Sequence, residues 1–228
     1  MFTRSAFGIK RACRQAGFTI VEATIVVSAV AILASSATPV ISGFVEAARM
    51  TRAKSDLKVL GTAIQMYRVD TAESLFYQKG KVNSGKKDAS VSVKMLVSNG
   101  DSPQIGSEGD SDWAMPYDGR LVDTFQDHLI TNTPGYVTSN GRTAGFAQPS
   151  QGGFNAPFAW RGPYVNAPVN PDPWGNRYAC NVLYLAPSTG NDVVLLSAGP
   201  DGSVSSEFSK DGLVAGGDDM ILTVSGGK

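Results

Sequence analysis

The sequence is poor in the side chains that most often carry catalytic chemistry. Its 228 residues include one histidine, His128, and two cysteines, Cys13 and Cys180. The metalloprotease pattern HExxH, the hydrolase pattern GxSxG and the full phosphate-binding pattern GxxxxGK[ST] are absent. Because we expect the segment with Cys13 to be removed, one thiol remains and no intrachain disulfide can form. These absences argue against an enzyme, although a membrane-tethered hydrolase is kept as the alternative class.

The chain also lacks an excess of either charge. Its 20 Lys and Arg balance its 20 Asp and Glu, and no basic cluster is interleaved with aromatic residues in the soluble part. Nucleic acid is therefore not expected as a partner. Glycine and proline are scarce in the first 70 residues, which hold four of the 25 Gly and one of the 12 Pro. This change in composition predicts one globular domain with a structurally different appendage.

The N-terminal end combines a basic segment with a long apolar run. Residues 1–17 contain four basic residues and no acid, and this is typical of a targeting segment. From residue 18 to 44 the only charge is Glu22, and a helix of this length measures roughly 40 Å against a bilayer core of roughly 30 Å. The run is too long for the apolar part of a secretory signal peptide, which is the alternative. We expect a transmembrane helix with the basic end in the cytoplasm.

The sequence Gly17-Phe18-Thr19-Ile20-Val21-Glu22 before this helix resembles the processing and assembly motif of type IV pilins and type II secretion pseudopilins. The resemblance implies cleavage between Gly17 and Phe18 by a prepilin peptidase and methylation of the new Phe18 amine. It also implies that Glu22 meets the Phe18 amine of a neighbouring subunit. That pairing relieves the desolvation of both charges, so Glu22 selects the register of assembly. A carboxylate that merely reaches the membrane surface is the alternative.

A second helical pattern follows the apolar run. Apolar residues recur at spacings of three and four, which predicts an amphipathic helix continuing from residue 45 to about Asp70 and packed by its apolar face on a sheet; they are Met50, Ala53, Leu57, Leu60, Ile64 and Tyr67. Packing in a coiled-coil dimer is the alternative, but the pattern covers less than two heptads. Pro39 is expected to kink or locally open the apolar half.

The rest of the chain indicates an α+β domain. Residues 78–160 are rich in turn-forming residues and are predicted to be a variable, irregular insertion. From residue 161 to 228, three apolar runs separated by turn signals predict a small antiparallel sheet; they are 178–185, 193–197 and 220–224. The predicted organisation is therefore a leader over 1–17, a membrane helix over 18–44, an amphipathic helix over 45–77, the insertion and the sheet, as in the type IV pilin-like fold.

The C-terminal part carries a second resemblance. The order GPY, DPWGN, a strand, LLSAGPDG and GGDDMIL is similar to the end of the major pseudopilin of type II secretion systems. That resemblance implies calcium, held by the side chains of Asp201, Asp218 and Asp219 and by carbonyls near Ala198 and Ser203. Three nearby carboxylates repel one another unless a cation neutralises them, and calcium prefers oxygen ligands. The longer loop also allows Glu207 or Asp211 to compete, and three exposed loop acids are the alternative.

These resemblances imply a subunit of a type II secretion pseudopilus. Such a subunit is anchored in the inner membrane with its domain in the periplasm, and it polymerises into a filament that helps to drive folded proteins across the outer membrane. The implied partners are other copies, minor pseudopilins, the inner-membrane assembly platform and the peptidase. A type IV pilus subunit for adhesion, motility or DNA uptake is the alternative. The single mature cysteine favours the pseudopilus, because pilus subunits commonly close their C-terminal region with a disulfide.

Overall fold

The structure, a computed structural model, describes residues 17–71, 93–105, 122–133, 146, 148–149, 158–185, 193–209 and 212–224. Contacts divide the chain into two compact units, residues 1–46 and 47–228. Of the predicted parts, the leader before Gly17, residues 72–77 of the amphipathic helix, most of the insertion over 78–160 and Asp211 lie outside the described residues.

Helix α1 runs from Ile20 to Thr71 without interruption, close to the predicted limits. Thr19 begins it, since its hydroxyl accepts the backbone N–H of Glu22 at 3.2 Å. Pro39 lies inside the helical segment, and the Ser42 hydroxyl donates to the Pro39 carbonyl at 2.9 Å. The side chains from residue 17 to 44 are all exposed. By length and composition this helix can cross a membrane, and its apolar end is the part that meets that test.

The second unit is built on a five-stranded sheet with the order β3-β1-β4-β5-β9. Its strands are β1 (Met95–Val97), β3 (Val122–Thr124), β4 (Ala179–Cys180), β5 (Val193–Ser197) and β9 (Met220–Val224). The α+β class is confirmed, and β5 and β9 match the predicted runs. The sheet is mixed rather than antiparallel throughout, because β3 pairs with β1 in parallel while the other neighbours are antiparallel.

Smaller elements surround this sheet. Strands β2 (Gln104–Ile105) and β6 (Ser203–Val204) pair in parallel, and β7 (Glu207–Ser209) forms a hairpin with β8 (Gly212–Val214). Helix α2 covers Phe125–Leu129. The predicted insertion over 78–160 is thus not wholly irregular, because it supplies β1, β2, β3 and α2. Two of its strands belong to the main sheet, where all three apolar residues of β1 are buried.

The run 178–185 does not form one strand as predicted. Strand β4 ends at Cys180, and a 3-10 helix follows over Val182–Leu185. Asn181 explains the change, since its side-chain oxygen accepts the N–H of Val194 at 2.7 Å. A side chain here takes a place that a backbone carbonyl would fill in a longer strand.

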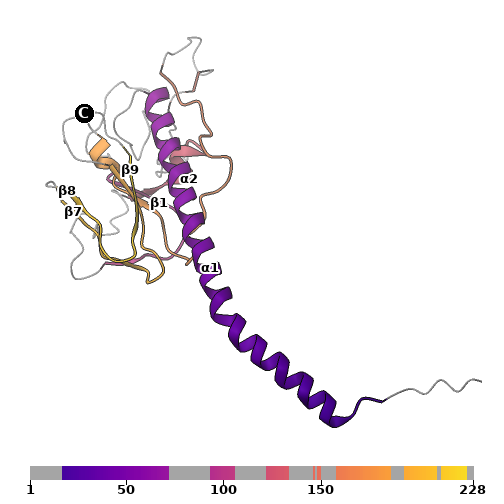
Figure 1. Ribbon diagram of the computed structural model, residues 1–228. Coiled ribbons are helices and arrows are strands. Elements are labelled where there is room, and N and C mark those ends of the chain that lie inside the picture. Colours follow the sequence, from indigo (N-terminus) through magenta and orange to yellow (C-terminus); the bar gives the residue numbers. More distant parts are fainter. Residues whose placement is uncertain are drawn as a thin grey trace, which may run out of the picture. The chain divides into compact units, whose positions relative to one another are not determined.

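The core lies between the second half of α1 and the sheet, as Figure 1 shows for the helix beside β9 and β1. The helix residues in it repeat at helical spacing and are Ala53, Leu57, Leu60, Gly61, Ala63, Ile64, Tyr67 and Thr71. Gly61 marks a close approach, because a Cβ built there would be 3.0 Å from the Leu222 Cδ2. The predicted packing of this amphipathic face on the sheet is confirmed from Ala53 onward, whereas Met50, which the pattern also included, is 38% exposed.

Candidate functional site

The motif for processing and assembly lies at the start of α1. Gly17 and Phe18 precede the helix, and the Phe18 side chain is 76% exposed. Glu22 is exposed in the first helical turn, where the helix dipole favours a negative charge. Glu22 is the fourth residue after the predicted new amine at Phe18, so both groups lie at one helix end and are open to contact by another molecule.

The second candidate site is the acidic loop between β5 and β9. Gly199 and Gly202 adopt positive φ angles of 69° and 68°, which turn the chain back on itself. The Asp201 carboxylate accepts the N–H of Ser203 at 2.7 Å, while the Asp201 N–H donates to Asp218 Oδ2 at 3.2 Å. The loop therefore folds back onto the residues before β9. This approach is the condition for a metal site shared by Asp201 and Asp218.

Asp219 holds the next part of the same loop. Its Oδ2 accepts the N–H groups of Ser205 at 2.9 Å and Ser206 at 2.6 Å. Burial raises the pKa of Asp219, although hydrogen bonds from Ser206 and Ser205 oppose the rise and nearby Asp218 adds to it. The acid thus tethers the loop through one oxygen.

The second carboxylate oxygen of Asp218 and of Asp219 is a potential ligand for a cation. Asp218 Oδ1 and Asp219 Oδ1 are buried and have no hydrogen-bond partner among the residues that the structure describes. Buried carboxylate oxygens without donors are costly, and they are the hard ligands that calcium prefers. The donor chemistry at Asp218 and Asp219 therefore fits calcium.

The remaining predicted ligands are placed less directly. The Asp201 carboxylate accepts a hydrogen bond from the Ser203 N–H. Ala198, the residue after β5, is buried, and Glu207 is exposed. In the part of the chain that the structure describes, no three His, Cys, Asp or Glu side chains are arranged to hold a metal ion. Two carboxylates with orphaned oxygens are thus brought together, and Asp201 joins them through its backbone N–H.

Sequence reasoning gave His128 no role, and the structure shows what it contacts. The ring is buried, and its Nε2 lies 2.8 Å from Asp123 Oδ2. Its backbone carbonyl accepts the indole N–H of Trp160 at 3.0 Å. The pair joins α2 to the end of β3 inside the fold. Its signal in the sequence was weak, because an Asp five residues before a His is common.

A structural residue was also missed in the DPWGN turn. Asp172 is buried, and its Oδ1 accepts the N–H groups of Trp174 and Asn176 at 3.0 and 2.8 Å. Its Oδ2 accepts the Ser197 hydroxyl at 2.7 Å, which fixes the turn to the end of β5. The turn-forming residues around Trp174 predicted a corner here. No local pattern in the sequence predicted the hydrogen bond between Asp172 and Ser197 of β5.

The long apolar helix, the small mixed sheet with long loops and the Gly-Phe-x-x-x-Glu helix start define a pilin-like α+β protein. Within that class, residues 130–214 match the model of the family "Type II secretion system (T2SS), protein G". The resemblance indicated by the sequence is thereby confirmed. The matched residues include Asp201, whereas Glu22, Asp218 and Asp219 lie outside them.

A curated relative gives the same result over a shorter stretch. The chain is 37% identical over 57 residues to the type II secretion system core protein G of Pseudomonas aeruginosa. The alignment covers 25% of this chain and 40% of the relative, so it spans about two fifths of the relative's length. No solved structure matches the chain significantly.

Proposed function

We propose that this chain is a structural subunit of a type II secretion pseudopilus. The observation that carries the proposal is the Gly17-Phe18 junction and Glu22 at the start of an exposed apolar helix, in a chain that resembles the secretion protein G family. In this proposal the subunit waits in the inner membrane with its domain in the periplasm. Filament growth then helps to move folded proteins across the outer membrane.

Assembly depends on a charge pair between copies. Cleavage after Gly17 creates a cationic amine at Phe18, and Glu22 of a neighbour supplies the carboxylate. In a bilayer each of these charges is costly alone, so only the stagger that pairs them is favourable. The prepilin peptidase creates this amine, and the assembly platform and the minor pseudopilins are the further partners. This is the role of a building block rather than of an enzyme.

Calcium is proposed as the ion of the acidic loop. The two buried oxygens, Asp218 Oδ1 and Asp219 Oδ1, support this assignment. When bound, the ion supplies a positive charge that neutralises the carboxylates. The chain's own part is to hold the loop in place through the N–H groups of Ser205 and Ser206. In a chain without an intrachain disulfide, this bridge would close the C-terminal region.

The function is tested by Glu22→Ala in the full chain, produced with the secretion machinery of its host. We expect normal cleavage after Gly17 but no filaments, as measured by immunoblot of processing and by electron microscopy of filaments released from the periplasm. Thr24→Ala is the matched control, since Thr24 is also exposed on this helix and its hydroxyl only bonds to the Val21 carbonyl. Normal filaments from Glu22→Ala would refute the proposed register role.

The same strains separate the two filament classes. A pseudopilus subunit is required for release of folded exoproteins, whereas a type IV pilus subunit is required for adhesion, motility or DNA uptake. Loss of exoprotein release with normal surface motility supports the pseudopilus. The reverse pattern identifies a pilus subunit.

A further inference from the structure

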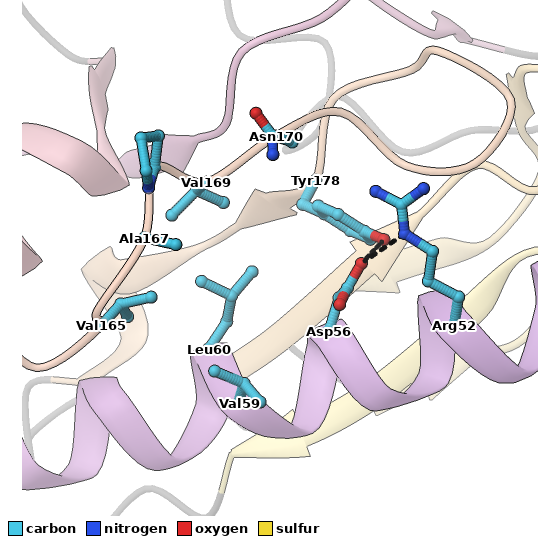
Figure 2. Close-up of a pocket in the computed structure, with 10 residues that line it drawn as sticks. Arg52, Asp56, Val59, Leu60, Val165, Ala167, Val169, Asn170 and Tyr178 are labelled. Carbon is cyan, nitrogen blue, oxygen red and sulfur yellow. Dashed lines mark hydrogen bonds and ion pairs between the residues drawn. The ribbon is translucent and has the colours of Figure 1, made fainter.

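A cavity of about 250 Å³ opens between the second half of α1 and residues 165–170, as Figure 2 shows. Most of its wall is apolar and is formed by Val59, Leu60, Val165, Ala167, Pro168 and Val169. Val59 is 51% exposed at the opening, while Leu60 and Val169 are buried. The cavity is large enough for one bulky side chain and too small for a helix.

One end of the cavity is polar. The Tyr178 hydroxyl donates to Asp56 Oδ2 at 3.0 Å, and Arg52 Nε lies 3.6 Å from the same oxygen (Figure 2). The Arg52 side chain is 55% exposed. An apolar socket with a polar, half-exposed rim is the arrangement found at the centre of protein interfaces. Arg52 and Asp56 at the rim carry opposite charges, so the rim has no net charge.

The chain also presents a side chain of the kind that such a socket takes. Phe158 is 58% exposed. The residue after it is anchored, because the Ala159 N–H donates to the Asp70 carbonyl at 2.9 Å, near the end of α1. The next residue, Trp160, is buried. The Phe158 ring is therefore exposed to solvent on a segment that is fixed to the domain. Burying such a ring removes about 150–250 Å² of accessible surface from solvent.

The socket and the ring lie at different levels of one helix. Asp56 is at the socket and Asp70 is beside Phe158, which places them roughly 20 Å apart along the axis at about 1.5 Å per residue. A copy therefore cannot fill its own socket. When a contact between these two surfaces is made in one direction only, it joins copies head to tail, and its repetition gives a ring or an open filament.

We propose that the cavity beside Val59 receives Phe158 of a second copy of this chain. The inference rests on the proposed function and names a contact between the soluble domains that adds to the one at Glu22. It assigns the subunit a donor side, Phe158, and an acceptor side, the socket. Growth along the helix axis then places the ring of one copy against the next.

The test is cross-linking between copies in membranes of cells that produce the full chain with its secretion machinery. In a Cys13→Ser background, one copy carries Arg161→Cys, an exposed position near Phe158 that leaves the ring in place, and the other carries Ala167→Cys, at the exposed mouth of the socket. A short bifunctional maleimide is then added. We expect dimers only when both variants are present, and a ladder of larger products when one chain carries both cysteines. Buried Cys180 should not react.

A second variant tests the socket itself. Val59→Asp should lower the cross-linking of the mixed copies by about tenfold, because it places a charge in an apolar interface. Val214→Asp is the matched control, since Val214 is 63% exposed and lies on β8 away from the socket. The control should cross-link as the parent does. Thermal unfolding of both variants shows whether they remain folded.

The outcomes separate the two proposals. Filaments that need Glu22 but give no product from the mixed copies overturn the socket and leave the proposed function intact. Dimers from either single variant alone also overturn it, because they require a symmetric contact. Mixed-copy products without any filaments support the socket and count against the proposed function. Occupation by an exported protein instead of a second copy predicts no product between copies.

Discussion

The Tyr178 hydroxyl donates to Asp56 Oδ2 at 3.0 Å across 122 residues of sequence. This bond joins the start of β4 to the outer side of α1, next to the apolar face that the helix buries. Tyr178 is buried, and the Asp56 side chain is 38% exposed. The bond therefore fixes the helix on the sheet at its polar border.

We expect Tyr178→Phe to lower the free energy of unfolding by about 1 kcal/mol, because Asp56 can be rehydrated when the bond is lost. Urea denaturation of residues 47–228 measures the effect, since this unit contains all the buried core residues that the structure describes. Asp56→Ala and the double variant complete a cycle. Purely additive losses would mean that the two side chains do not couple.

Gly61 gives a second prediction, based on packing. Gly61→Val should destabilise the unit by about 1–3 kcal/mol, because the added methyl groups meet Leu222 and Leu195 of the sheet. Thr62→Val at the next, exposed position is the control and should change stability by less than about 0.5 kcal/mol. Both are measured by urea denaturation. Equal effects would show that helix propensity, rather than contact with the sheet, decides the result.

Cys180 gives a prediction about reactivity. The thiol is buried in β4, and burial raises its pKa. We expect the folded unit to react with a thiol reagent only at the rate at which it opens, so increasing urea should speed the reaction in step with unfolding. The absorbance of the thiolate that the reagent releases measures the rate of this reaction. Rapid reaction of the folded protein would contradict the buried position.

Tyr164 gives a prediction for alkaline pH. Burial raises its pKa to about 12, partly opposed by the Arg161 N–H that donates to its oxygen at 3.0 Å. A raised pKa in the folded state means that the stabilisation is complete below about pH 10 and is lost as the pH rises toward 12. Over that range the parent should therefore lose more stability than Tyr164→Phe. An equal fall of stability with pH in the parent and in Tyr164→Phe would show that Tyr164 does not cause this pH dependence.

Removal of the two acids tests the calcium proposal. With calcium about tenfold above its dissociation constant, binding adds roughly 1.4 kcal/mol, which corresponds to a rise of several degrees in melting temperature. Asp218→Ala combined with Asp219→Ala should abolish this rise, as measured by thermal unfolding with calcium and with chelator. An equal loss of stability in chelator would mean that the acids act through the N–H groups of Ser205 and Ser206.

The parts of the fold that could be predicted depend on local patterns. Helix α1 and strands β5 and β9 follow from apolar runs with clear turn signals at their ends. The parallel pairing of β3 with β1 could not be predicted, because no periodicity within either three-residue strand specifies a partner. The early end of β4 depends on the side chain of Asn181, which reads as an ordinary polar residue in an apolar run.

The candidate sites divide in the same way. Gly17, Phe18 and Glu22 could be found because they are close in sequence and lie beside an apolar helix. The approach of Asp201 to Asp218 was predicted from acids in two turns. The socket could not be predicted, since its walls come from α1 and from residues 165–170. Long-range packing alone brings them together.

Strand β9 is the last element of the chain that the structure describes and lies at one edge of the sheet. It supplies Leu222 and Val224 beneath Gly61 of α1, and it follows directly on the two acids that tether the loop. Loss of β9 would therefore expose this part of the helix, around Gly61. In the proposed filament, a copy without β9 would therefore carry the assembly motif of α1 on an incomplete domain.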